Sequence, residues 1–518
     1  MNAAKDPAAL DAIALSVLSA TLAGIAEEAG ALLIHTAYSS NIKERRDCSA
    51  ALFDAGGRMV AQAEHIPVHL GAMPDSVAAV IGRGPRIGDV WALNDPFRGG
   101  SHLPDLTLVA PFELEPGAGI DGYAVTRAHH SDVGGMRPGS MPADSRELFQ
   151  EGIVVPPLRL VRDGAYVDDV LDLLLANVRT PHVRRGDLRA QIAAGALAAQ
   201  RLAELARRRG AAVVRAAFGE TIAYAERRTR EILASLPDGT WEARGEIEGD
   251  GTSDDDVALR VCVKLAGDEL HVDFAGSAPQ VAGNVNCPLA VTRSACCFVL
   301  RVLVGGDVPA NSGAYAPLQV SAPEGSVVNA LAPAAVVAGN VETSQRIADT
   351  VLLALAQGVE LPAQGQGTMN NLVIGAPGWS YYETIGGGQG ASAVGPGLSG
   401  VHVGMSNTLN TPIEALELEY PLRVQRYELR PGSGGAGRHR GGDGLERSIR
   451  VLEDCALSLL SDRRRHAPQG AAGGNSGACG ENLLNGEPLP PKTSRQLRAG
   501  DVVTVRTPGG GGWGAPTS

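Results

Sequence analysis

The chain has 518 residues, 44% of them hydrophobic and 20% charged, which is typical of a globular protein. This length favours two or three domains, since a single hydrophobic core rarely extends over so many residues. The formal net charge of −12 disfavours a nucleic-acid partner, which normally requires a basic face.

The seven cysteines form no CxxC pair, which indicates a reducing compartment rather than a disulfide scaffold. The N-terminus lacks a basic segment ahead of an apolar core, and we find no apolar run of transmembrane length. We therefore expect a cytoplasmic protein that has no membrane partner.

The first half of the chain is predicted to begin with a helix and to continue with short strands. Apolar residues recur every three or four positions from residue 10 to 36, which indicates a long amphipathic helix. The pattern then predicts a hairpin at 50–53 and 59–61, a helix at 70–81, and strands at 89–93, 106–109 and 123–127. Residues 187–236 form the longest helical stretch, and Gly210 is expected to divide it into two helices.

The second half is predicted to become progressively richer in strands and glycine. We expect strands at 241–248, 255–265 and 269–274, helices at 288–304 and 343–356, and strands at 423–430, 445–451, 456–461 and 502–507. The prediction is a multi-lobed α+β chain, with a mixed α/β N-terminal lobe at 1–185, a helical and mixed middle at 186–415, and a β-rich, glycine-rich C-terminal lobe at 416–518.

Three short segments concentrate residues that could carry chemistry: 45–49 (RRDCS), 94–105 (NDPFRGGSHLPD) and 127–135 (RAHHSDVGG). In the second, Leu-Pro separates His102 from Asp105 and keeps the backbone extended or turned. The two preceding glycines let this loop approach a bound group closely. The segments therefore indicate a candidate active site within residues 95–132.

The ligand types in these segments suit a metal. His129 and His130 point to opposite sides if their strand continues, so that one binds and the other supports; alternatively, the backbone turns and both converge. Mixed imidazole and carboxylate ligands suit a divalent transition metal such as Zn²⁺, Mn²⁺ or Fe²⁺. Because no HExxH or other standard zinc motif is present, spacing alone leaves metal binding and ordinary structural histidines as equal alternatives.

A further histidine pair, His65 and His69, has the i, i+4 spacing of a helical ligand pair. Pro67 would break such a helix. We therefore interpret both as pocket-lining or structural residues.

Longer motifs extend over nearly the whole chain, in order: 44–53 (ERRDCSAALF), 65–71 (HIPVHLG), 99–105 (GGSHLPD), 128–135 (AHHSDVGG), 342–346 (ETSQR), 367–371 (GTMNN) and 508–514 (PGGGGWG). In these motifs the chain resembles the hydantoinase B/oxoprolinase family. That family includes the B-type subunits of ATP-dependent N-methylhydantoinases and caprolactamase, part of 5-oxoprolinase, and subunits of acetone carboxylase.

The resemblance implies a divided reaction on a cyclic amide such as a hydantoin, 5-oxoproline or a lactam. A partner hydantoinase A-type subunit, an ATPase that uses ATP and Mg²⁺, phosphorylates the substrate, and the B-type subunit performs the metal-assisted attack. This chain contains no GxxxxGK[ST] phosphate loop, which agrees with ATP binding on another chain in a hetero-oligomer.

The resemblance also implies roles for individual residues. The metal ligands would lie among Asp47, His102, Asp105 and His130, with His129 and Asp132 as alternative ligands or supporting partners. The catalytic residues would be His129, Asp132 and Asp95, of which Asp132 or Asp95 could orient a ligand histidine or accept the proton of a bound water.

Two other functions are compatible with the same sequence. One is a carboxylase that joins CO₂ to an activated ketone, as in acetone and acetophenone carboxylases. The other is a non-catalytic scaffold that holds the ATPase and binds no metal.

Overall fold

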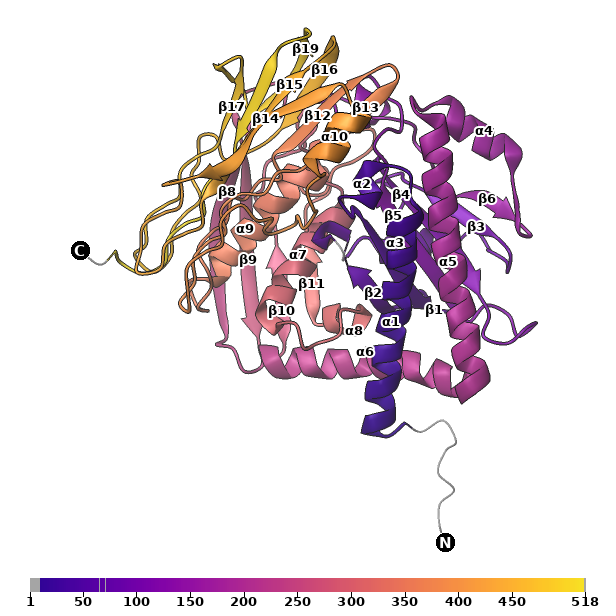
Figure 1. The fold of residues 1–518 in the computed structure, drawn as a ribbon. Helices are drawn as coiled ribbons and strands as arrows, with labels where there is room; N and C mark the ends of the chain where they lie inside the picture. Colours follow the sequence, from indigo (N-terminus) through magenta and orange to yellow (C-terminus); the bar gives the residue numbers. More distant parts are fainter. Residues whose placement is uncertain (1–9, 65, 70, 517–518) are drawn as a thin grey trace.

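The computed structural model describes residues 10–64, 66–69 and 71–516 (Figure 1). It contains long helices and four separate sheets of four to seven strands. The predicted α+β class is confirmed.

The N-terminal sheet is antiparallel, with the strand order β2-β1-β5-β4-β3-β6-β7. Its strands are β1 (Cys48–Asp54), β2 (Met59–Glu64), β3 (Val90–Leu93), β4 (Asp105–Phe112), β5 (Gly122–His129), β6 (Leu158–Arg162) and β7 (Ala165–Tyr166). The central strands are buried on both faces, so alternate residues of β1 enter different cores. Leu52 packs with the long helices described next, whereas Phe53 packs with α3 (Met73–Ile81).

Three long helices cover one face of this sheet: α1 (Ala12–Thr36), α5 (Pro181–Arg209) and α6 (Ala211–Leu233). Gly210 separates α5 from α6 as predicted, with a φ of 91° that an L side chain rarely adopts. α6 then runs from the N-terminal sheet towards the second sheet (Figure 1). The short helices α2 (Ser40–Lys43) and α4 (Asp168–Ala176) flank this group.

Helix α1 corrects one expectation from the sequence. It is long and apolar enough to cross a membrane by length and composition, although we expected no such segment. Core helices pass the same test, and in this structure α1 packs against α5 and the sheet through residues such as Leu22 and Leu33.

The second sheet has the order β11-β10-β9-β8 and supports the largest core. Its strands are β8 (Gly239–Glu248), β9 (Asp256–Ala266), β10 (Glu269–Asp273) and β11 (Leu318–Ser321), and its helices are α7 (Leu289–Val304), α8 (Ser312–Tyr315) and α9 (Ser344–Leu355). A single π-helical turn, η4 (Gly339–Thr343), leads directly into α9. The 3₁₀ turns are η1 (Pro67–His69), η2 (Pro138–Ser140) and η3 (Leu148–Gln150).

Two further sheets pack together towards the C-terminus (Figure 1). One is ordered β13-β12-β16-β19 and the other β14-β15-β20-β17-β18. Their strands are β12 (Asn371–Ala376), β13 (Trp379–Glu383), β14 (Leu422–Arg430), β15 (Gly444–Val451), β16 (Cys455–Leu460), β17 (Glu481–Leu484), β18 (Glu487–Leu489), β19 (Lys492–Leu497) and β20 (Val502–Arg506), with α10 (Ile413–Glu419) beside them. Because β12 pairs with β16, strands on either side of residue 415 share one sheet. The boundaries at 185 and 415 stay predictions.

Candidate metal centre

The centre lies where β4 begins and β5 ends. Asp105 is the first residue of β4 and lies directly opposite His129, the last residue of β5. The backbone nitrogen of His129 also donates to the carbonyl oxygen of Asp47, 3.0 Å away, just before β1. Three strand ends therefore bring together segments that are far apart in the sequence.

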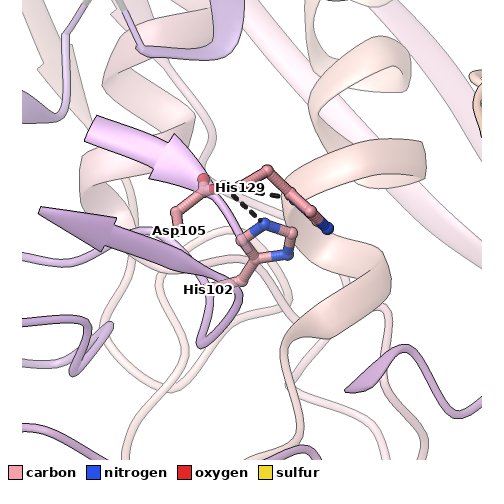
Figure 2. Close-up of side chains that lie close together, drawn as sticks. All are labelled: His102, Asp105 and His129. Atoms are coloured by element: carbon pink, nitrogen blue, oxygen red, sulfur yellow. Dashed lines mark ion pairs between the residues drawn. The ribbon is translucent and has the colours of Figure 1, made fainter. Parts of the chain in front are cut away.

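His102, Asp105 and His129 form a buried group whose ligand atoms lie within 4.8 Å of one another (Figure 2). Asp105 Oδ1 lies 3.0 Å from His102 Nε2 and 3.3 Å from His129 Nδ1. The other carboxylate oxygen, Oδ2, accepts a hydrogen bond of 2.7 Å from Ser101 Oγ. One carboxylate thus orients two imidazoles.

His69 is a third imidazole at the same carboxylate. Its Nε2 lies 3.5 Å from Asp105 Oδ2, and its Nδ1 is 2.9 Å from Ser49 Oγ. Pro67 begins the 3₁₀ turn η1 that carries His69, so the proline shapes the approach of this histidine instead of removing it from the site. The paired residue His65 lies outside the described residues.

The electrostatics of the group favour an ionised Asp105 beside neutral imidazoles of His129 and His69. Burial opposes the ionisation of Asp105, but the neighbouring imidazoles, His102 foremost, hold its pKa well below its usual value. Burial lowers the pKa of His129 to about 4 and also lowers the pKa of His69. These are the protonation states that metal ligands require.

Several nitrogens of the group have no hydrogen-bond partner among the described residues. They are His69 Nε2, both ring nitrogens of His102, and His129 Nε2. The contact between His102 Nε2 and Asp105 is short, but it does not meet hydrogen-bond geometry. Because buried polar atoms are normally satisfied, this cluster of free donor and acceptor atoms fits a bound cation. His102, Asp105 and His129 could hold a metal.

Asp47 lies beside this group. Its side chain is buried, and burial, followed by the charge of Asp105, raises its pKa to about 7. Arg45 and then His102 act in the opposite direction on the same pKa, and the hydrogen bond from the His129 nitrogen holds the Asp47 backbone next to the group. The ligand role implied for Asp47 is compatible with this position and stays a prediction.

His130 points away from the group. Its Nε2 lies 2.9 Å from Gln191 Oε1 on α5, and its ring borders a small apolar cavity of about 30 Å³. The structure therefore places the two neighbouring histidines on opposite sides, one of the two arrangements expected from the sequence. It brings His129, and not His130, next to His102 and Asp105.

Asp132 and Asp95 serve local backbone geometry in this structure. Asp132 accepts hydrogen bonds of 2.9–3.0 Å from the backbone of Gly134 and Gly139 and from the backbone and guanidinium of Arg179. Asp95 accepts from the backbone nitrogen of Phe97 at 3.0 Å and lies 3.5 Å from Arg98 Nε. Their implied catalytic roles stay predictions.

Sequence spacing gave no role to two residues that shape the site. The ring of Tyr382 stacks on the His129 imidazole, with centroids 4.6 Å apart and planes inclined by 10°. The fully buried Arg45 lies over the Tyr382 ring, 5.1 Å from its centroid, and donates a hydrogen bond of 2.6 Å to the Tyr382 carbonyl oxygen. Only the fold brings Tyr382, on β13, to a site otherwise built from the first 130 residues.

Comparisons of the sequence with known proteins agree with the resemblance. A profile of the family described as Hydantoinase B/oxoprolinase matches residues 11–516. The chain is 33% identical to the B component of a putative D-/L-hydantoinase from Pseudomonas sp. (strain NS671), over 98% of this chain and 90% of that protein. It is 39% identical to 5-oxoprolinase 1 from Arabidopsis thaliana over 98% of its own length, but spans only 42% of that relative.

Solved structures share the fold. The crystal structure of ATP-dependent caprolactamase from Pseudomonas jessenii superposes with a TM-score of 0.90 at 30% identity, covering 98% of this chain and 91% of that one. A nucleotide-free acetone carboxylase structure gives a TM-score of 0.84 at 19% identity, covering 97% of this chain and 75% of the other. At that lower identity, the likeness shows the fold alone.

Proposed function

Because the chain belongs to the hydantoinase B/oxoprolinase family, whose members include ATP-dependent cyclic-amide hydrolases, we propose that it is the B-type subunit of such a hydrolase. Its substrate would be a hydantoin, 5-oxoproline or another lactam. A partner A-type subunit would use ATP and Mg²⁺ to phosphorylate the substrate, and this chain would perform the metal-assisted attack.

One observation carries the proposal: the buried His102–Asp105–His129 group with its unpartnered imidazole nitrogens. An amide carbonyl is a poor electrophile, and phosphorylation of its oxygen creates a good leaving group. A divalent transition metal such as Zn²⁺, Mn²⁺ or Fe²⁺ would supply a nucleophile at neutral pH and stabilise developing negative charge.

The residues of this chain would bind and orient. His102, Asp105 and His129 would hold the metal, with Asp47 as the proposed fourth ligand. Ser101 fixes the Asp105 carboxylate, and Tyr382 covers one face of His129 and shields it from water. Such outer partners fix the orientation of ligands and commonly change metal affinity when they are lost.

The partner is proposed from two facts. The Pseudomonas relative is named as the B component of a hydantoinase, which implies an accompanying A component. This chain, in turn, has no Walker-type phosphate loop for ATP. We propose a hetero-oligomer of both chains, located in the cytoplasm, where the cysteines, all free in the structure, would stay reduced.

The test is reconstitution of the chain with an A-type partner. Purified complex is assayed for ATP-dependent ring opening of hydantoin, 5-oxoproline and ε-caprolactam, with Asp105→Asn as the inactive control. We expect product and ADP to form together with the wild type, and product to be lost in the variant. Product that forms only when bicarbonate is present would support the carboxylase alternative instead.

Metal content separates an enzyme from a scaffold. The chain is purified without chelator, and its metal is determined by elemental analysis. A wild type with less than about one-tenth equivalent of metal would favour the scaffold alternative, because structural and catalytic sites of this kind bind tightly.

A further inference from the structure

A second cavity, of about 330 Å³, lies between α7, α9 and the loops at 361–367 and 389–404. Its volume is at the lower end of the range for small-molecule sites. Neither the three residues of the metal centre nor Tyr382 lines it. The cavity is therefore a space separate from the candidate metal centre.

One wall of this cavity is apolar. Phe298 and Val302 extend from α7, Leu352 and Leu353 from α9, and Leu361 from the following loop. All five are at least partly exposed, although the first four belong to helices whose other faces form the largest core. This wall offers a hydrophobic surface to a small ring.

The lining also carries carboxamides that can donate hydrogen bonds. Gln364 Oε1 already accepts from Arg463 at 3.1 Å and from the Gln469 backbone at 2.9 Å, and Gln389 Oε1 accepts from the Leu398 backbone at 3.1 Å. The oxygens of Gln364 and Gln389 are thus engaged. Their amide nitrogens have no partner among the described residues, so two donors remain for a ligand.

Asp349, on α9, supplies an acceptor near Gln364, since the Arg463 guanidinium contacts both side chains. Its Oδ2 lies 2.5 Å from Arg463 Nη2 and 3.5 Å from Arg346 Nη1. The second oxygen, Oδ1, accepts no hydrogen bond within the described part of the chain and is left for another donor. Because two guanidinium groups compensate the carboxylate, Asp349 offers a hydrogen-bond acceptor without leaving an uncompensated negative charge.

The remaining titratable group of the lining, His402, is neutral at physiological pH. Burial, together with the charge of Arg45, lowers the pKa of His402 to about 3. Its ring nitrogens lie 2.7 Å from Ser406 Oγ and 3.4 Å from Thr408 Oγ1. A charged ligand would lose its hydration here without gaining a counter-ion, whereas an uncharged one would not.

From this lining we infer that the cavity is a second ligand site, and that it takes a small uncharged cyclic amide. The amide of such a ring is held cis, so its carbonyl oxygen and its N–H lie on one edge. That edge carries the acceptor and the donor that the free carboxamide nitrogens and Asp349 would bind, and the methylene groups can contact the apolar side chains of the lining. Neither partner nor metal is needed for binding, so the inference does not rest on the proposed function.

A row of side-chain contacts leads from the cavity to the metal centre. Thr408, next to His402, accepts a hydrogen bond of 3.0 Å from Arg45 Nη2. Arg45 in turn packs over Tyr382, which stacks on His129. Because the cavity lining and the metal group nevertheless share no residue, the two sites can be disabled separately.

The experiment is calorimetric titration of the metal-free chain, without partner, with ε-caprolactam as the probe. The 5-oxoproline anion and methylcyclohexane, which has no amide, serve as comparison ligands. We expect caprolactam to bind, and both comparison ligands to bind about tenfold more weakly or not at all. Methylcyclohexane lacks the one or two hydrogen bonds of the amide, and the 5-oxoproline anion is not neutral.

Matched variants locate the site. Val302→Trp fills the rim of the cavity, and Val394→Trp makes the same change at a residue that is 94% exposed and does not line it. Gln389→Leu removes one donor without adding bulk. We expect Val302→Trp and Gln389→Leu to weaken caprolactam binding about tenfold. Val394→Trp, and His102→Ala as the control for binding at the metal centre, should bind caprolactam like wild type.

Three results would overturn the inference. The first is the absence of caprolactam binding at about 10 mM, a concentration that detects very weak complexes. The second is equal binding by Val302→Trp, Gln389→Leu and wild type. The third is loss of binding in His102→Ala, which would place the ligand at the metal centre. Circular dichroism confirms that each variant is folded, and Gln389→Leu, on an exposed loop position, keeps the test decisive if Val302→Trp does not fold.

Discussion

His129 and His130 are neighbours in the chain, yet their rings face different environments. The first meets Asp105 and stacks on Tyr382, whereas the second meets Gln191 on α5. The end of β5 explains this difference, because successive residues of a strand point to opposite faces. The adjacent pair therefore provides a matched test of which imidazole binds metal.

We predict that His129→Ala lowers metal affinity at least about tenfold, while His130→Ala retains the metal content of wild type. The measurement is competition with a chromophoric chelator, followed by elemental analysis. Loss of the Gln191 hydrogen bond should still cost His130→Ala about 1 kcal/mol of unfolding free energy. If His130→Ala lost the metal and His129→Ala kept it, His130 and not its alternative His129 would be the ligand, and our assignment would be wrong.

Asp132→Asn is predicted to destabilise the protein without removing the metal. Asp132 Oδ2 accepts from the Gly139 nitrogen and from Arg179, so an amide group in its place would oppose two donors. We expect a loss of about 2 kcal/mol in unfolding free energy, measured in urea.

Asp95→Asn is the comparison, because the amide oxygen of the substituted side chain can still accept the hydrogen bond from the Phe97 nitrogen. Its stability should change by less than about 0.5 kcal/mol. A catalytic role for Asp132 would instead be supported by a variant of unchanged stability whose complex turns over more slowly.

The sequence predicts which residues are candidates for the site better than it predicts which of them are in contact. His102 and Asp105 were predicted together because only Leu-Pro separates them, and they do lie together. Because Pro67 excludes an α-helix, the sequence predicts His69 as a pocket-lining or structural residue and not as a ligand. In the structure, a 3₁₀ turn starting at that proline brings His69 to Asp105. Spacing rules for helices and strands could not anticipate this geometry.

At the scale of elements, clear periodicity made prediction reliable. The sequence predicts the long helices, the division at Gly210 and the strands β3, β4, β8, β9 and β15 close to their ends, except that α5 begins at Pro181 and not at Asp187. Strands without alternation were missed. β12 (NLVIGA) is buried almost throughout, and β17 to β19 are short and polar, so neither shows the period of two by which half-buried strands are recognised.

The π-helical turn η4 carries a buried carboxyl group, Glu342. Its Oε1 accepts from the Asn371 side chain at 2.9 Å and from the Met369 nitrogen at 3.1 Å. Burial, followed by the negative charge of Asp462, raises the pKa of Glu342 to about 7, from an ordinary value of 4.5. The folded protein therefore keeps this proton between pH 4.5 and 7, while the unfolded chain releases it.

Since unfolding releases a proton in that window, the contribution of Glu342 to stability falls as the pH rises from 4.5 to 7. Glu342→Gln cannot titrate, and its amide oxygen can still accept both hydrogen bonds. We predict that, as the pH rises across the middle of this window, the unfolding free energy of Glu342→Gln increases relative to that of wild type by about 1 kcal/mol per pH unit.

The measurement is urea denaturation of both proteins at several pH values between 5 and 8. Glu414→Gln, at an exposed position on α10, should follow the wild-type curve throughout. A constant difference between Glu342→Gln and wild type at every pH would show that Glu342 is ionised in the folded state.

At the scale of the whole molecule, the candidate centre depends on contacts that sequence spacing does not encode. Asp47, His69, His102 and His129 come from four segments of the first 130 residues, and Tyr382 lies more than 250 residues further along. Family resemblance could name most of these residues, because it carries information from other folded chains. Composition and periodicity could place each residue on an element, but not beside the others.

Arg45 is the residue that joins these distant parts. It is fully buried, and its guanidinium donates to the Tyr382 carbonyl oxygen at 2.6 Å, to Thr384 Oγ1 at 2.6 Å and to Thr408 Oγ1 at 3.0 Å. A planar guanidinium can serve three acceptors in fixed directions, whereas the compact ammonium of lysine cannot reproduce that fork. Arg45→Lys should therefore lower the unfolding free energy by about 3 kcal/mol.

The same substitution should weaken metal binding, because Arg45 fixes Tyr382 and Tyr382 fixes the His129 ring. Arg46→Lys is the matched control, since Arg46 is the next residue, is exposed, and undergoes the same change. Urea denaturation and chelator competition on both variants give the two readouts. If Arg45→Lys were as stable as Arg46→Lys and bound metal equally well, then Arg45 would fill space between the two halves of the chain without holding the centre in place.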